Sequence, residues 1–140
     1  MATRSEIGIE RENGKVEVIY CHWDGYIENN GKILFENYAT RDKVEDLIKL
    51  GDLSILGKSI NPDPRKPHTF DNAQDDVCVA YGRDRGEEHT QSKIMSKEDF
   101  VKELEMVDYL YLFTKKNEWK VKWYQTVSWQ QLSKYFVKGD

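Results

Sequence analysis

The chain has 140 residues, of which 39% are hydrophobic and 33% charged, and its net charge is −4. This length and balance suit one folded domain over residues 1–140 and exclude an intrinsically disordered chain. No apolar run approaches the roughly 18 residues of a membrane span, and residues 1–6 lack the apolar core of a signal peptide. We therefore expect a cytoplasmic protein.

The N-terminal part predicts two strands, over residues 3–10 and 15–23, that form a hairpin. They are joined at Asn13-Gly14. This dipeptide favours a type I′ turn because both residues tolerate a positive φ. The second strand is apolar on both faces, which is typical of a central strand.

Two helices are predicted next, a short one over residues 33–38 and a longer one over residues 41–50. Thr40 is a suitable N-cap for the longer helix, and Gly51 is expected to end it. All three prolines of the chain lie within residues 57–75, which predicts an extended loop.

The second half of the chain predicts three more strands, at residues 77–81, 109–113 and 119–123. A charged loop is expected over residues 82–95. The sequence that begins at Ser96 resembles a capping box and predicts a helix after that loop.

The last predicted element is a helix over about residues 128–137, capped by Ser128, with Trp129, Leu132 and Phe136 facing inward. The chain then holds about five strands and about four helices. Because tight hairpins join antiparallel strands, we expect a mainly antiparallel sheet in a single α+β domain.

The densest polar stretch, residues 20–26, combines a thiol, an imidazole, a carboxylate and three aromatic rings. His22 is either a general base oriented by Asp24 or a structural histidine, and the lack of a neighbouring nucleophile favours the structural role. A carboxylate among aromatic rings requires a cation if it is buried. We therefore expect Asp24 to pair with an arginine, Arg4 first and Arg85 second.

A second polar stretch, residues 81–88, follows the strand that carries Cys78. Arg83 and Arg85 are two residues apart and can converge on a phosphate or carboxylate. The alternative is a solvated loop in which neighbouring acidic residues neutralise both arginines. The candidate binding residues of the two stretches are Arg4, His22, Asp24, Tyr26, Tyr81, Arg83, Asp84, Arg85 and Glu87.

The sequence predicts neither a metal site nor a cofactor. Cys21 and His22 point to opposite faces of one strand, and the chain has no paired metal-ligand spacing, phosphate-binding loop or dinucleotide fingerprint. Without an export signal, Cys21 and Cys78 are expected to be free, buried thiols.

The charges are unevenly distributed along the chain. Residues 1–114 carry 15 basic and 23 acidic side chains, whereas residues 115–140 carry six lysines and two acidic side chains. An acidic body favours a basic partner. Lysines and aromatic residues interleave after Lys120, as in proteins that bind single-stranded nucleic acid, but Trp119 and Trp123 share the face opposite the lysines, which favours a core role.

Three segments carry a resemblance to a known family: Ala2-Thr3-Arg4-Ser5, Tyr20-Cys21-His22-Trp23-Asp24-Gly25-Tyr26 and Arg83-Asp84-Arg85-Gly86-Glu87. The pattern resembles a family of small proteins encoded by bacteriophages and prophages, for which no activity is established. The resemblance covers residues 1–88 well, extends to about residue 121 and does not include the final helix. Ile27 stands where the pattern usually has proline. Gly82 stands where it usually has histidine, which argues against a histidine-dependent activity there.

The resemblance implies a phage accessory protein, and phage proteins of this size often inhibit host defence, CRISPR effectors included. The leading hypothesis is therefore a non-enzymatic inhibitor that binds and blocks a host protein or nucleoprotein in the bacterial cytoplasm. A basic surface such as the nucleic-acid channel of a CRISPR effector suits the acidic body.

Two alternatives remain open. One is a small enzyme or nucleotide-binding protein with its site around His22, Asp24, Arg83 and Arg85. The other is a single-stranded nucleic-acid binder that uses the basic C-terminal face. A cleft that joins the two polar stretches would favour the first alternative, and an acidic patch would favour the inhibitor.

Overall fold

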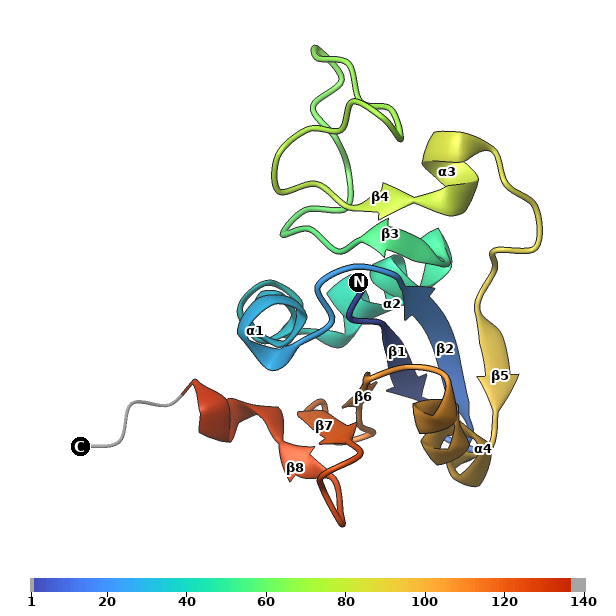
Figure 1. Ribbon diagram of the computed structural model, residues 1–140, viewed down its shortest axis with the longest axis vertical. Helices are drawn as coiled ribbons and strands as arrows, with labels where there is room; N and C mark the ends of the chain where they lie inside the picture. Colours follow the sequence, from blue (N-terminus) through green and yellow to red (C-terminus); the bar gives the residue numbers. More distant parts are fainter. Residues whose placement is uncertain (1, 137–140) are drawn as a thin grey trace.

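A mixed β-sheet organises the protein (Figure 1), which is described over residues 2–136 in a computed structural model. Eight strands form the sheet in the order β4-β3-β2-β1-β6-β7-β8, and β5 also pairs with β2. The strands are β1 (Ser5–Glu10), β2 (Val16–Cys21), β3 (Leu53–Ile55), β4 (Val79–Ala80), β5 (Lys93–Met95), β6 (Tyr109–Phe113), β7 (Trp119–Trp123) and β8 (Gln130–Gln131). The α-helices of this part are α1 (Lys32–Asn37), α2 (Arg41–Leu50), α3 (Tyr81–Arg85) and α4 (Lys97–Lys102). The α+β class is as predicted.

The predicted N-terminal hairpin is confirmed. Strands β1 and β2 pair antiparallel from Ser5 opposite Cys21 to Glu10 opposite Val16. The turn differs from the predicted type I′ turn, because Gly14 alone among the turn residues has a positive φ, of 85°. The strands are joined instead by a three-residue loop that ends in this left-handed glycine.

Substituting Gly14→Ala is expected to lower the free energy of unfolding by about 1 kcal/mol, the typical cost of placing a Cβ in the left-handed region. A Cβ at this position would meet no atom within 4 Å, so the loss reports the backbone alone. Urea unfolding measures it. The exposed neighbour Glu12→Ala is the control, and an equal loss in both variants would contradict this explanation.

The sheet has eight strands where about five were predicted, which corrects the count. Five of its seven pairings are antiparallel, in line with a mainly antiparallel sheet, and two are parallel. Strand β1 pairs with β6 in parallel, from Ser5 opposite Tyr109, and β2 pairs with β3 in parallel at Cys21. Hairpin signals specify only pairings between neighbouring strands, and these two pairings join strands separated by long connections. The added strands β4, β5 and β8 have two or three residues each, too few to show a periodic pattern.

Two predicted helices form where their capping residues predict. Helix α2 begins after Thr40, whose hydroxyl oxygen accepts a hydrogen bond from the Lys43 N–H, and ends at Gly51 with a φ of 87°. Helix α4 begins after Ser96, whose hydroxyl accepts from the Asp99 N–H at 3.1 Å. Helix α1 likewise lies close to its predicted range.

Two predicted segments are wrong in type. Residues 81–85 form helix α3 in place of a strand end and a loop, and the charged segment that follows also contains β5. The expected helix over about 128–137 is β8 followed by a 3-10 turn at Leu132–Tyr135, and residue 137 lies outside the described residues. Trp129 consequently lies on the face opposite to Leu132, in contact with Phe100.

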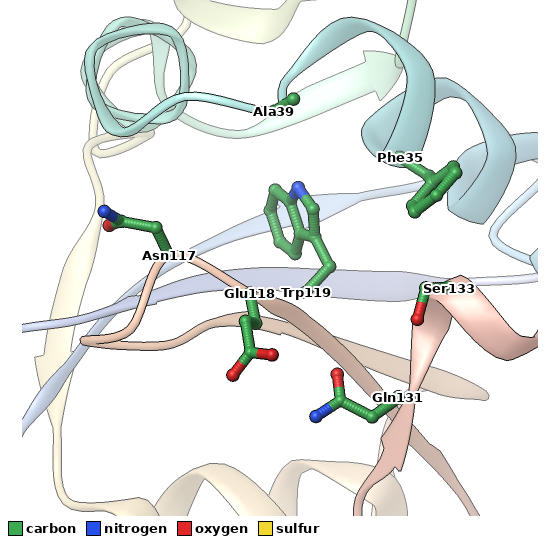
Figure 2. A pocket seen from close by; sticks show the side chains of 7 residues that line it. All are labelled: Phe35, Ala39, Asn117, Glu118, Trp119, Gln131 and Ser133. Atoms are coloured by element: carbon green, nitrogen blue, oxygen red, sulfur yellow. The ribbon is translucent and has the colours of Figure 1, made fainter.

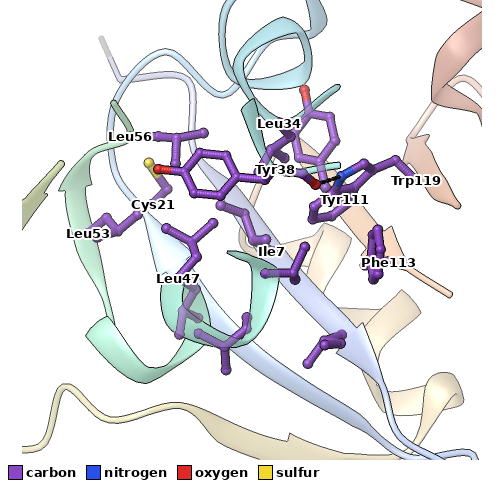
Figure 3. Packing of buried hydrophobic residues seen from close by; sticks show 14 of the residues in the cluster. Ile7, Cys21, Leu34, Tyr38, Leu47, Leu53, Leu56, Tyr111, Phe113 and Trp119 are labelled. Atoms are coloured by element: carbon purple, nitrogen blue, oxygen red, sulfur yellow. Dashed lines mark hydrogen bonds between the residues drawn. The ribbon is translucent and has the colours of Figure 1, made fainter. Parts of the chain in front are cut away.

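The main core lies between the sheet and helices α1 and α2 (Figure 3). Ile7 and Cys21 project from the sheet toward Leu34 and Leu47 of these helices. Trp119 is buried in the same layer, and its indole N–H donates to the Tyr38 carbonyl at 2.8 Å, so its predicted core role is confirmed.

A smaller core covers the other face of the sheet. Phe100 of α4 packs there on Val16, Val18, Leu110 and Leu112. Because the amphipathic helix α4 covers this second face, β1 is covered on both faces, and every residue of β1 is buried. Among the described residues, no helix combines the length and apolar character that crossing a membrane requires.

Candidate functional site

His22 lies directly after β2 and contacts its own strand. Its Nδ1 is 2.7 Å from the Tyr20 hydroxyl, and its ring meets Trp23 edge-on at 4.7 Å between centroids. Tyr20 and His22 share a face of the extended chain, as the alternation predicts. These contacts orient the imidazole toward the strand and its neighbouring aromatic ring.

The predicted pair between Asp24 and an arginine is wrong. Asp24 is exposed and takes part in no ion pair within residues 2–136. Water solvates its carboxylate, so no cation is required. Asp24 adopts a left-handed φ of 57°, and its carbonyl accepts hydrogen bonds from the backbone of Asn30 and the side chain of Asn29, both at 3.2 Å. Arg4 instead donates its backbone N–H to Asp108 at 2.9 Å.

Arg83 anchors the proline-containing loop. Its guanidinium donates to the carbonyls of Ile60 at 2.6 Å and Cys78 at 2.8 Å, and to Asp84 at 2.9 Å. The Asp84 side chain is 5% exposed and also accepts the Ala80 N–H at 2.8 Å. Burial alone would raise the pKa of Asp84, but the hydrogen bonds from Arg83 and Ala80 hold it below its usual value.

His68 completes this anchor from the loop side. Its side chain is almost fully buried, its Nε2 lies 3.4 Å from the Asp84 carboxylate, and its Nδ1 accepts the Gln74 N–H at 3.0 Å. The loop is thereby fastened to α3 at two points, near its beginning at Ile60 and in its middle at His68.

Arg85 contacts the same loop at a different place. Its guanidinium lies over the Phe70 ring, 4.9 Å from the centroid, and 3.5 Å from Glu87. The Tyr81 ring also packs against Phe70, with the two ring centroids 5.5 Å apart. Residues two apart on a helix point in different directions, so the arginines do not converge as a strand end would have placed them. Acidic neighbours take up both guanidinium groups, as the alternative prediction has it.

Asp24 lines a cavity of about 350 Å³ between the segment after β2 and the loop before β4. Three aspartates, Asp24, Asp75 and Asp76, line it, and the described lining includes no basic residue. The rest of the wall is mainly apolar and includes Ile33 and Ile55. The cavity is completed by residues 73–79 rather than by the arginines of α3, so it does not join the two polar stretches.

Three exposed apolar side chains belong to the segments that form this acidic cavity, namely the segment after β2 and the end of β3. Trp23 is 42% exposed, Tyr26 38% and Ile55 43%. The backbone N–H of Trp23 donates to the Ser54 carbonyl at 3.1 Å, which places Trp23 next to Ile55 at the end of β3. We call the three apolar side chains and the three aspartates of the cavity the acidic–aromatic face.

A buried carboxylate cluster was not predicted from the sequence. Glu6 on β1 is 7% exposed, and it lines a cavity of about 50 Å³ with Asp52, Lys93 and Glu103. Burial raises the pKa of Glu6 to about 8, with the Glu103 carboxyl as the second cause, and burial also raises the pKa of Asp52. Glu6 is therefore protonated at neutral pH. One signal in the sequence could have indicated this burial. The segment after Ser96 is amphipathic, so its apolar side has to pack on a face of the sheet.

The face of the sheet beyond α4 carries a basic groove of about 450 Å³. Its lining includes Lys97, Lys115, Lys116, Lys120 and Trp129. The groove lies at the junction of the α4 N-terminus, the turn after β6 and strand β8.

A smaller pocket of about 220 Å³ lies on the other side of β7 and β8 (Figure 2). Trp119 points into it toward Ala39, whereas the side chains of Glu118 and Gln131 point away from Trp119. Glu118 and Gln131 also line the basic groove, so they form a shared rim between the two hollows.

Both cysteines are free and buried, as predicted. Burial raises the pKa of Cys21 to about 12, and the Asn30 amide donates to its sulfur at 3.4 Å. Cys78 accepts the Gly57 N–H at 3.2 Å. Both thiols are thus protonated packing groups. Within residues 2–136, no three His, Cys, Asp or Glu side chains are arranged to hold a metal ion.

No protein-family model matches the chain, and comparison with curated proteins and with solved structures gives no significant match.

Proposed function

We propose that this protein binds a partner through the acidic–aromatic face and thereby blocks a basic surface of that partner. The observation that carries the proposal is the cavity lined by three aspartates and no basic side chain. Exposed Trp23 and Tyr26, in the same segment as Asp24, supply the aromatic anchors that are enriched in protein interfaces.

The chemistry of the cavity suits an arginine or lysine side chain of the partner. The apolar wall at Ile33 and Ile55 can contact the aliphatic stem of such a residue, and the carboxylates can bind its charged end. The resemblance to phage proteins supplies the setting, in which the partner is a host protein or nucleoprotein, such as the nucleic-acid channel of a CRISPR effector. Charge complementarity of this kind mainly raises the association rate and the specificity.

The test compares two variants that raise the net charge equally, by four. The face variant combines Asp75→Lys with Asp24→Asn and Asp76→Asn, because asparagine accepts the left-handed φ of the latter two positions. The control variant combines Asp46→Lys with Glu105→Lys, at exposed positions on α2 and after α4. A labelled arginine-rich peptide is titrated first, and capture from host lysate then identifies the partner.

We expect the face variant to bind the peptide and the captured partner at least tenfold more weakly, with association slowed by salt in the wild type. The control variant and His22→Ala should retain binding, since His22 contacts Tyr20 and does not line the cavity. Equal losses in the face and control variants would overturn the proposal, and so would abolished partner inhibition in His22→Ala alone.

A further inference from the structure

The sheet face on which α4 packs is basic where α4 does not cover it. The register of β6, β7 and β8 places Leu112, Lys120 and Gln131 side by side across three strands. Phe100 of α4 covers the row at Leu112, but Lys120 lies beyond that cover and lines the groove. A longer α4 would also cover the position of Lys120. Because α4 does not extend that far, this position is open and holds a lysine.

The groove's buried glutamate is already neutralised. Glu10 accepts the Lys115 backbone N–H at 3.0 Å, and its carboxylate forms an ion pair with Lys97. Burial would raise the pKa of Glu10, but these contacts keep it below its usual value.

Three ammonium groups of the groove remain available. Lys115, Lys116 and Lys120 form no ion pair within the described part of the chain. Exposed Glu118 is the remaining acidic residue of the lining, so the free charge of the groove is positive on a protein of net charge −4.

Trp129 forms one wall of the groove with a ring that is held in place. The ring is half-buried and stacks on Phe100, with centroids 5.8 Å apart and planes inclined by 22°. This contact uses one face of the indole, and Trp129 also lines the groove. An aromatic ring fixed beside several lysines is the arrangement on which proteins stack the bases of a single strand.

We propose that this groove is a second binding site, which takes single-stranded nucleic acid. Lys115, Lys116 and Lys120 bind successive phosphates, and one base stacks on Trp129. The volume of about 450 Å³ is in the range of small-ligand sites and fits a nucleotide. The ring favours nucleic acid over an acidic peptide, which would use the lysines alone. The site is independent of the acidic–aromatic face.

The experiment titrates the full chain with a fluorescein-labelled oligothymidylate of about 12 nucleotides and, separately, with labelled polyglutamate of similar length. Three phosphate contacts predict a slope of about −2 for the logarithm of the binding constant against that of the salt concentration. The triple variant Lys115→Glu, Lys116→Glu, Lys120→Glu should bind at least tenfold more weakly, with a slope near zero. Exposed lysines on α1 and α2 supply the matched control, Lys32→Glu, Lys43→Glu, Lys49→Glu, which should bind like the wild type.

Trp129→Leu tests the stacking separately. We expect roughly tenfold weaker binding of the oligonucleotide with an unchanged salt slope, because one base–ring contact is lost and no phosphate contact. Circular dichroism and the thermal midpoint check that Trp129→Leu is folded. If Trp129→Leu does not fold, the triple lysine variant still tests the groove. No binding at low salt, equal losses in the triple variant and its control, or polyglutamate bound as tightly as the oligonucleotide would each overturn the proposal.

Discussion

Glu6→Gln is expected to raise the free energy of unfolding by about 4 kcal/mol at pH 8 and to change it little at pH 4. The folded protein holds the pKa of Glu6 at about 8, against 4.5 for an unperturbed glutamate. Between these two values the unfolded chain gains free energy by ionising and the folded chain does not, so the wild type loses stability as the pH rises from about 4.5 to 8. Glutamine removes the ionisation and keeps a hydrogen-bond donor beside Glu103.

Chemical unfolding at pH 4, 6 and 8 measures this effect. Exposed Glu36→Gln on α1 is the control and should shift stability by less than about 0.5 kcal/mol at each pH. If the difference between Glu6→Gln and the wild type does not grow with pH, the carboxyl group is not held protonated in the folded state.

Asp84→Ala is expected to lower the free energy of unfolding by about 3 kcal/mol, because it removes one partner of a buried ion pair. Arg83 would keep its bonds to the carbonyls of Ile60 and Cys78, but its charge would be uncompensated. The loop over residues 57–75 should also be cleaved faster by trypsin. Since the pKa of Asp84 is held low, its contribution is present near neutral pH and is lost as the pH falls below the usual value.

The neighbouring pair provides the control for this prediction. Glu87→Ala breaks the contact with Arg85, but both side chains are about half exposed, so a loss below about 1 kcal/mol is expected. The double variant Arg83→Ala, Asp84→Ala should cost less than the two single variants together. Additive losses would show that the two side chains do not act as a unit.

Elements with local signals could be predicted from the sequence. The β1–β2 hairpin, α2 and α4 each follow from a turn dipeptide or a capping residue within a few positions of the element. Their physical causes are hydrogen bonds between near neighbours, which a single sequence displays directly.

Long-range pairings could not be predicted in this way. The neighbour of β1 is β6, and nothing in Ser5–Glu10 distinguishes this parallel partner from another apolar strand. The same limit applies to Glu6, because the alternation of Ile7 and Ile9 with polar residues by itself indicates a strand with one polar face. The second face of the sheet is buried only because α4 packs on it.

The sequence indicated which residues were candidates for the site, but it did not predict how they are arranged in space. The arginines of α3 bind the loop that contains Ile60 and Phe70, which lie 13 or more positions earlier in the chain. Asp24 was assumed to be buried because its neighbours are aromatic, and those neighbours are themselves exposed. Trp129 was assigned to an inward helix face, whereas β8 brings its ring to the basic groove.

The position of β1 at the middle of the sheet has a consequence for synthesis on the ribosome. One edge of β1 pairs with β2 at once, but the other waits for β6, so Ser5 meets Tyr109 only after about a hundred further residues have been made. Contacts of such long sequence separation slow folding. Until then β1 presents an unpaired apolar edge, the kind of template that other chains can join. A nascent chain stopped before residue 109 should therefore aggregate, whereas one that extends past β7 should fold.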